Sequence, residues 1–248
     1  MMTTEFLFFA NLVLLLRLRL LLADGLVGAG RWAGKAIVEL LALALFEPHA
    51  FLMWAAVAIL AFNAIAALAE KRMRDRSGAR LLWGMLQLVA FSILFSNAGG
   101  VHFRAELADG GNWIASWSTI GAELLRLTTT RGLKMLLGLL LAANEANLLV
   151  RWLLGRLQIK PGTIALGDGR IDANEFNRGR VIGLLERVLI YAFVLSGQYG
   201  AIGFTLAAKG FTRFKELENR GFAEYVLIGT LLSSSLAMAA GVWVRFAL

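Results

Sequence analysis

The chain of 248 residues is 58% hydrophobic and only 17% charged. Soluble domains average roughly 45–50% apolar and about 25% charged residues, so this composition excludes an ordinary water-soluble core and favours long apolar helices in a bilayer. With no cysteine and 2 histidines, disulfides, thiol catalysis and zinc–thiolate sites are excluded, and we expect no metal and no cofactor. The net charge of +8 gathers in short loops beside apolar runs, which indicates lipid headgroups rather than nucleic acid as the partner.

The first apolar run covers residues 6–30 and is interrupted by Arg17 and Arg19. It does not resemble a signal peptide, because it lacks a basic start and no small-residue cleavage site follows. Either the run spans the membrane with its arginines facing protein or water, or it lies partly in the interface. We favour a span.

A helical hairpin is predicted next. Residues 36–46 have about half the length of a membrane span, and Pro48 then breaks the helix because it cannot continue a helix interior. Residues 51–68 are long enough to span. The excess of Lys and Arg in residues 70–80 predicts a cytoplasmic loop by the positive-inside rule, and residues 81–96 form the return span.

Residues 101–131 differ from their neighbours because they are polar at first and then amphipathic. Trp113, Trp117 and Leu124 belong to an apolar set at helical spacing, which predicts a helix over residues 112–130. Tryptophans at its start suit the headgroup level, so we interpret it as an interfacial helix on the non-cytoplasmic side. Packing of the same face against the protein itself is an equally good alternative.

Three further apolar segments follow, over residues 132–154, 181–208 and 222–246. The sequence therefore predicts an all-α polytopic transmembrane bundle with about six or seven membrane segments plus the interfacial helix. The predicted organisation has three parts: N-terminal transmembrane helices over 1–157, a cytoplasmic loop over 158–180, and a C-terminal helical hairpin over 181–248.

The predicted loop contains a motif that resembles the second half of a calcium-binding EF-hand loop, over residues 167–176. Asp168 and Glu175 match oxygen ligands of that loop. The first two ligand positions, however, hold Ile164 and Leu166, which have no side-chain oxygen. We therefore interpret the motif as a Gly-Asp-Gly turn followed by a helix start.

Polar residues in or near the apolar segments supply the candidate site, either as an ion path or as interhelical hydrogen-bond partners. The set is Asn144, Glu145, Asn147, Glu186, Arg187, Gln198, Tyr199, Lys209, Arg213 and Glu224. For Asn144, Glu145 and Asn147 we slightly favour hydrogen bonding, since Glu145 lies near a helix end. Arg187 is expected to anchor the cytoplasmic end or to meet Glu145 or Glu224.

Gly197, Gly200 and Gly203 recur at three-residue spacing. They indicate either a re-entrant break whose carbonyls face a pore or a close helix–helix contact, and we favour the contact. The choice decides the side of the basic connector 209–220. A simple span of residues 181–208 places this connector outside, whereas a fold-back places it in the cytoplasm, as the positive-inside rule prefers. We favour the simple span.

The stretches GRVIGLLERVLI, GQYGAIGFTLAAKGFTRF and AEYVLIGTLLS resemble the C-terminal region of an uncharacterised bacterial family of polytopic membrane proteins, known as a domain of unknown function. The resemblance covers residues 178–233 and implies a bacterial inner-membrane location without assigning a reaction. The matching positions are Gly183, Glu186, Arg187, Gln198, Ala201, Ile202, Gly203, Lys209, Arg213, Glu224, Tyr225 and Gly229.

These features favour a channel or transporter for ions or small solutes, acting as a homo-oligomer among membrane lipids. The alternative is a non-transporting scaffold or regulatory subunit that docks a cytoplasmic protein through the basic loops 70–80 and 158–180. An enzyme is not expected, because the sequence has no Ser/His or His/Asp pairing, metal cluster or Gly-rich nucleotide loop.

Overall fold

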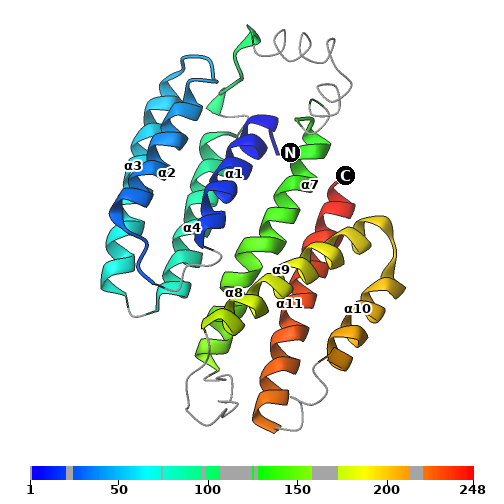
Figure 1. The fold of residues 1–248 in the computed structure, drawn as a ribbon. Helices are drawn as coiled ribbons and strands as arrows, with labels where there is room; N and C mark the ends of the chain where they lie inside the picture. Colours follow the sequence, from blue (N-terminus) through cyan, green and yellow to red (C-terminus); the bar gives the residue numbers. More distant parts are fainter. Residues whose placement is uncertain are drawn as a thin grey trace. The chain divides into compact units, whose positions relative to one another are not determined.

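In the part of the chain that the computed structural model describes, the named secondary-structure elements are all helices (Figure 1). The described residues are 2–20, 25–73, 75–96, 99–106, 125, 128–157, 173–212 and 220–248. They group into two compact units, Met1–Leu140 and Leu141–Leu248, which we call unit 1 and unit 2. The predicted all-α class is confirmed.

Four of the described helices are long and apolar enough to cross a membrane: Ala50–Arg72, Arg76–Leu94, Thr130–Arg156 and Ala223–Ala247. A spanning helix needs about 20 predominantly apolar residues, so these four have the length and composition of an integral membrane protein. The predicted total of about six or seven membrane segments is not confirmed by them. The predicted interfacial helix 112–130 lies almost entirely outside the described residues, as does most of the predicted loop 158–180.

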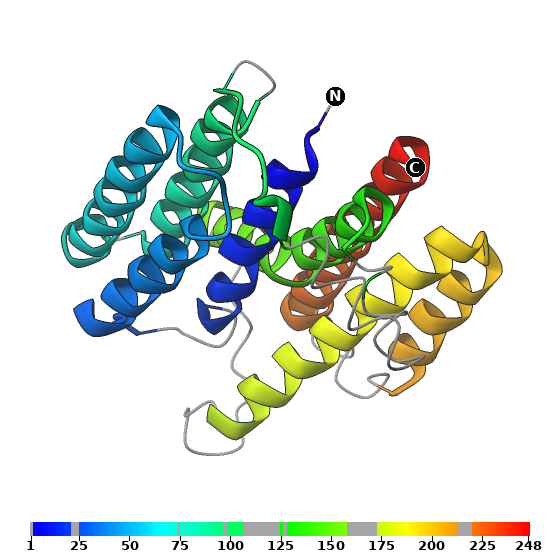
Figure 2. The same cartoon turned by 90° about the horizontal axis from the view of Figure 1, so that it is seen from above.

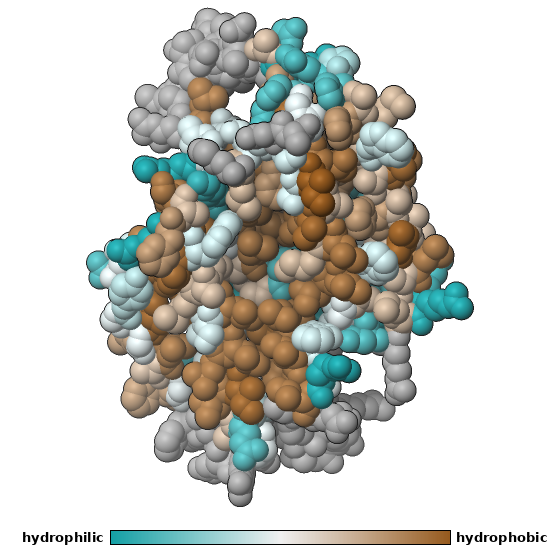
Figure 3. Space-filling model, turned by 180° about the vertical axis from the view of Figure 1, so that it is seen from behind, coloured by the Kyte–Doolittle hydropathy of each residue, from teal (hydrophilic) through white to brown (hydrophobic). Residues whose placement is uncertain are grey.

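Unit 1 is built around three consecutive helices. Its elements are α1 (Thr4–Arg17), the 3-10 turn η1 (Leu18–Leu20), α2 (Ala29–Leu43), α3 (Ala50–Arg72), α4 (Arg76–Leu94) and α7 (Thr130–Leu140). Helix α3 packs against both α2 and α4, while α1 packs against α4 and α7 (Figure 1). Apolar side chains on α3, among them Met53, Trp54 and Leu68, remain exposed. Hydrophobic surface also dominates the face shown in Figure 3, as expected where lipid takes the place of water.

The predicted first segment, residues 6–30, is not one continuous span. Helix α1 has 14 residues and ends at Arg17, and α2 begins only at Ala29. Helix α1 is about 21 Å long, which is shorter than the roughly 30 Å hydrocarbon core of a bilayer. Arg17 is buried, and its Nη2 donates to the backbone carbonyl of Arg80 at 2.9 Å. The arginine is thus satisfied inside the protein, and the prediction of a single span was wrong.

The predicted break before α3 is confirmed. Helix α2 ends at Leu43, and α3 begins at Ala50 after His49, whose Nδ1 accepts a hydrogen bond from the backbone N–H of Phe51 at 3.3 Å. Helix α2 starts seven residues earlier than the predicted segment 36–46, counting from Ala29 to position 36.

A buried ion pair closes the α3–α4 turn. Glu70 Oε1 accepts from Arg80 Nε at 3.1 Å and from Arg80 Nη2, while its Oε2 accepts from Trp32 Nε1 at 2.8 Å. Arg80 therefore belongs to the protein interior rather than to the predicted basic loop. Lys71 and Arg72 remain exposed at the end of α3 and keep the loop basic.

Unit 2 consists of the π-helical turn η3 (Leu141–Glu145), α8 (Ala146–Arg156), α9 (Ala173–Ser196), α10 (Tyr199–Thr212) and α11 (Arg220–Ala247). Helix α9 packs against α10 and α11, and α11 also packs against α8 and η3 (Figures 1 and 2). Because α8 packs within unit 2, the division between the compact units precedes the predicted boundary at 157.

Residues 181–208 fold back on themselves, so the favoured prediction of a simple span was wrong. Helix α9 ends at Ser196, and Gly197 follows with a φ of 73°. The N–H of Gly197 bonds the carbonyl of Val194 at 3.2 Å, and that of Gln198 bonds the carbonyl of Phe193 at 2.8 Å. These two bonds form a Schellman motif, in which a glycine adopts the left-handed conformation and terminates a helix.

The other two glycines of the predicted helix–helix contact do not serve it within the described part of the chain. A methyl group at Gly200 or Gly203 would meet nothing within 4 Å. Close approach occurs instead between α9 and α11, where a methyl group at Gly241 would lie 2.8 Å from Cβ of Val194.

Candidate functional site

The predicted site residues of η3 and α8 are buried in unit 2. Asn144, Glu145 and Asn147 are 0%, 3% and 8% exposed, and Asn144 Nδ2 donates to Glu145 Oε1 at 3.0 Å. The Oδ1 of Asn144 is buried without a hydrogen-bond partner among the described residues. Single π-helical turns inside α-helices often occur at functional sites. The role of these three residues, as an ion path or as hydrogen-bond partners, stays a prediction.

Arg187 lies in α9 beside this turn. Its Nη2 donates to the carbonyl of Ala143 at 3.3 Å, and its Nη1 donates to Ser233 Oγ of α11 at 3.2 Å. The side chain is buried, and its two hydrogen bonds tie α9 to η3 and to α11 inside unit 2. The sequence predicted that Arg187 either anchors the cytoplasmic end of its helix or meets Glu145 or Glu224. The hydrogen bonds of its guanidinium go instead to a backbone carbonyl and a hydroxyl.

Glu186, the residue before Arg187, forms an ion pair with α10. Lys209 Nζ donates to Glu186 Oε2 at 2.6 Å, and this ion pair joins α10 to α9. The pair lies ten residues before the end of α9 and ten residues after the start of α10, as antiparallel packing of a helical hairpin requires. The fold-back therefore brings the end of α10 to the level of Glu186.

Four predicted residues remain: Gln198, Tyr199, Arg213 and Glu224. Gln198 and Tyr199 are exposed at the tip of the hairpin, where Arg245 Nη1 donates to the Tyr199 hydroxyl at 2.9 Å. Glu224 is exposed near the start of α11, and Arg213 lies outside the described residues. The described members of the predicted set are thus distributed over the π turn and α8, the α9–α10 contact, the hairpin tip and the start of α11.

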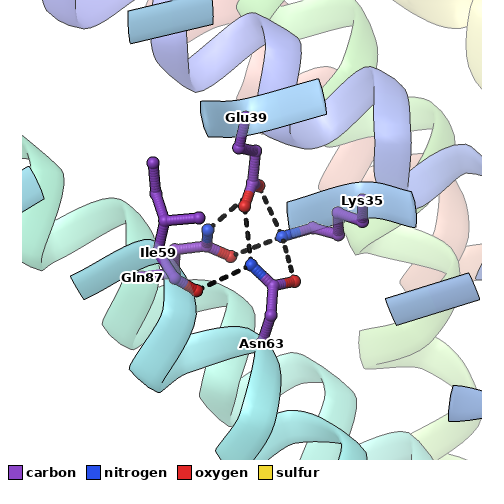
Figure 4. A network of polar contacts seen from close by, with 5 residues as sticks. All are labelled: Lys35, Glu39, Ile59, Asn63 and Gln87. Atoms are coloured by element: carbon purple, nitrogen blue, oxygen red, sulfur yellow. Dashed lines mark hydrogen bonds and ion pairs between the residues drawn. The ribbon is translucent and has the colours of Figure 1, made fainter. Parts of the chain in front are cut away.

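A second polar cluster, absent from the predicted set, lies in unit 1 among α2, α3 and α4 (Figure 4). It consists of Lys35 and Glu39 on α2, Asn63 on α3 and Gln87 on α4, and we call it the α2–α4 network. These side chains are buried, with exposed fractions of 5%, 0%, 4% and 4% in that order. A buried charge requires a partner, and the network supplies one for each of its two ions.

The network matches donors to acceptors. Lys35 Nζ donates to Glu39 Oε1 at 2.5 Å, to Gln87 Oε1 at 3.0 Å and to Asn63 Oδ1 at 3.1 Å, so each of the three ammonium protons has an acceptor. Glu39 in turn accepts from Asn63 Nδ2 at 2.7 Å and from Gln87 Nε2 at 3.1 Å. Both amides therefore bridge the two ions (Figure 4).

The network lies at the middle of two candidate spans. Asn63 is two residues from the midpoint of Ala50–Arg72, and Gln87 is two residues from the midpoint of Arg76–Leu94. At 1.5 Å per residue, each amide is attached about 3 Å from the centre of its helix. In a bilayer, an ion pair beside these positions lies at the depth where a charge is most costly.

The predicted set omits this network for a specific reason. Lys35 and Glu39 are four residues apart on one helix, a spacing that brings oppositely charged side chains together. The predicted segment began at position 36, so Lys35 was left outside it. Asn63 and Gln87 are isolated polar residues in apolar runs, which is the signal in the sequence that would have found them.

No protein-family model, curated protein or solved structure matches the chain. The resemblance of residues 178–233 to an uncharacterised bacterial membrane family consequently stays a prediction. The function has to be argued from the apolar helices and the chemistry of the buried polar residues.

Proposed function

We propose that the protein is an integral membrane channel or transporter for ions or small solutes, with the α2–α4 network at its centre. The observation that carries this proposal is the buried Lys35–Glu39 pair beside the midpoints of α3 and α4. Ionisable side chains at such depth usually mark ion or substrate pathways. In this proposal, transport includes a step in which the pair opens and closes.

Stability alone gives a weak reason for the pair. Replacing a buried ion pair by apolar residues of similar size is often neutral or stabilising, whereas removing one partner costs about 3–5 kcal/mol. Lys35 has a flexible four-carbon stem, which allows its ammonium to move without movement of the helix backbone. The pair is therefore suited to rearrangement during a transport cycle.

Charge movement across a reconstituted membrane tests this proposal. Proteoliposomes on a solid-supported membrane report net charge transfer whichever ion moves, and an enclosed pH-sensitive dye reports protons. We expect currents above those of empty liposomes. The double variant Lys35→Met/Glu39→Gln, which leaves no unpaired buried charge, is expected to reduce them at least tenfold, equivalent to about 1.4 kcal/mol in the barrier.

The ion pair of unit 2 supplies the matched control. Lys209→Met/Glu186→Gln also removes a lysine–carboxylate pair, but one that is partly exposed, and it is expected to retain at least half of the wild-type current. Loss of current only in this control would show that transport requires the ion pair of unit 2 and not the α2–α4 network. Absence of current in well-folded wild-type protein would reject transport of net charge through the α2–α4 network and favour the scaffold alternative.

A bacterial inner-membrane location, homo-oligomeric assembly and a cytoplasmic protein partner remain parts of the proposal, as does the absence of an enzymatic reaction. The exposed Lys71 and Arg72 support a cytoplasmic position for the α3–α4 turn. Because α10 folds back along α9, the start of α9 and the basic end of α10 are both expected on the cytoplasmic side of the membrane.

A further inference from the structure

The ammonium of Lys35 occupies a position where three side-chain oxygens converge. These are Glu39 Oε1, Gln87 Oε1 and Asn63 Oδ1, all within 3.1 Å of Nζ and supplied by three different helices. One carboxylate and two amide oxygens form a set of hard oxygen ligands, the type that alkali and alkaline-earth cations prefer. The three oxygens are therefore arranged as in a binding site for a small cation, and the ammonium of Lys35 fills that site.

The oxygens are held in place by contacts that do not involve the ammonium. Asn63 Nδ2 donates to Glu39 Oε2 at 2.7 Å and to the carbonyl of Ile59 at 2.9 Å, while Gln87 Nε2 donates to Glu39 Oε1 at 3.1 Å. Because each amide nitrogen is fixed on an acceptor, each amide oxygen continues to face the site when Lys35 leaves. The site is thus preorganised for a replacement cation.

The charge of the site selects a monovalent ion. Without the ammonium, the one carboxylate of the network leaves a net charge of −1, and a single positive charge restores neutrality. A divalent ion would leave an excess positive charge in a buried, low-dielectric position, which is strongly unfavourable. A monovalent alkali cation reproduces the charge balance that Lys35 provides.

We infer that Glu39, Asn63 and Gln87 form a binding site for a monovalent alkali cation, and that Lys35 is a tethered competitor for that site. The inference rests on the proposed transport function and names its substrate class. The cation enters as the ammonium withdraws, and the return of the ammonium expels it. Lys35 and Glu39 share α2, so this exchange requires rotation of one side chain.

Thermal unfolding of a variant without the competitor tests the inference in purified, detergent-solubilised protein. Lys35→Met leaves Glu39 buried without its cation, so binding of a free ion should stabilise the variant. We expect its Tm to rise on the order of 5 °C when choline chloride is replaced by potassium or sodium chloride at equal ionic strength. Wild-type protein should shift much less, since its site is occupied.

Two control variants show whether the shift belongs to this site. Lys35→Met/Glu39→Gln removes the charged ligand and should abolish the shift. Lys209→Met also leaves a carboxylate without its lysine. Among the described contacts of Glu186, however, no amide oxygens converge with its carboxylate on the ammonium, as those of Asn63 and Gln87 do beside Glu39. An equal shift in Lys209→Met, or no shift in Lys35→Met, would overturn the inference.

Equilibrium binding of radiolabelled rubidium to the wild-type protein gives a measurement that does not require Lys35→Met to fold. The inference predicts saturable binding, weakened by competition from the tethered ammonium, that potassium displaces and choline does not. Absence of saturable binding would count against the site even if charge movement is observed. Binding without charge movement would support the site and reject the transport proposal.

Discussion

Gly241 sets the distance between α9 and α11 at one point of contact. A methyl group at this position would lie 2.8 Å from both Cβ and Cγ1 of Val194, and the Cβ atom cannot move away without movement of the α9 backbone. Glycine is therefore required here by packing. By contrast, Gly203 on the exposed side of α10 faces open space among the described residues.

Gly241→Ala is expected to destabilise the protein by about 1–3 kcal/mol, because the added methyl overpacks a helix contact. Gly203→Ala is expected to be neutral or to stabilise α10 by up to about 1 kcal/mol, because alanine is the better helix former. Unfolding in detergent by heat or denaturant measures both. Equal destabilisation by the two substitutions would contradict the close contact between α9 and α11.

The buried polar residues show what could be predicted at the same scale. Asn144, Glu145 and Arg187 were identified as polar groups in apolar surroundings, and all three are buried. Their partners could not be predicted, because a side chain at membrane depth accepts any compatible neighbour that packing provides. Arg187 binds Ala143 and Ser233, which no pattern in the sequence distinguishes from nearby residues.

At the scale of elements, helix ends depend on single residues more than on hydropathy. Residues 181–208 are apolar enough to predict one continuous segment, yet the chain turns at Gly197 because the Schellman bonds satisfy the last carbonyls of α9. The sequence contained this signal as a glycine after an apolar helix. Hydropathy could not separate it from Gly200 and Gly203, which lie within α10 and its exposed surface.

Gly197→Ala is therefore expected to destabilise the α9–α10 hairpin by about 1–2 kcal/mol, the cost of a left-handed conformation for a residue with a Cβ atom. Gly200→Ala, three residues later in the first turn of α10, is the matched control and should not destabilise. Denaturant unfolding of the two variants measures the difference. Similar stabilities would show that position 197 does not require a positive φ.

At the scale of the whole molecule, the four candidate spans and the basic α3–α4 turn define an expected orientation. Helix α3 has 23 residues and is about 34 Å long, enough to cross the hydrocarbon core. Its first residue, Ala50, and the residue after its end, Met73, are both exposed. The two positions should therefore lie on opposite sides of the membrane.

Single-cysteine labelling tests this orientation cleanly, since the chain has no cysteine of its own. A membrane-impermeant maleimide should modify Met73→Cys in inverted inner-membrane vesicles but not in intact spheroplasts, and it should modify Ala50→Cys in the opposite preparation. Modification of both positions from the same side would exclude α3 as a span. A reversed pattern would exclude the cytoplasmic assignment of the α3–α4 turn.

Composition and hydropathy by themselves determined the all-helical class and the apolar length that makes α3 and α4 candidate membrane spans, because a long apolar helix satisfies its backbone without help from its neighbours. Only the tertiary structure decided which polar residues meet. Lys35 is 28 residues from Asn63 and 52 from Gln87, yet its ammonium contacts both. Their meeting depends on how α2, α3 and α4 pack, and the pattern within any one helix carries no information about the residue that faces it from the next.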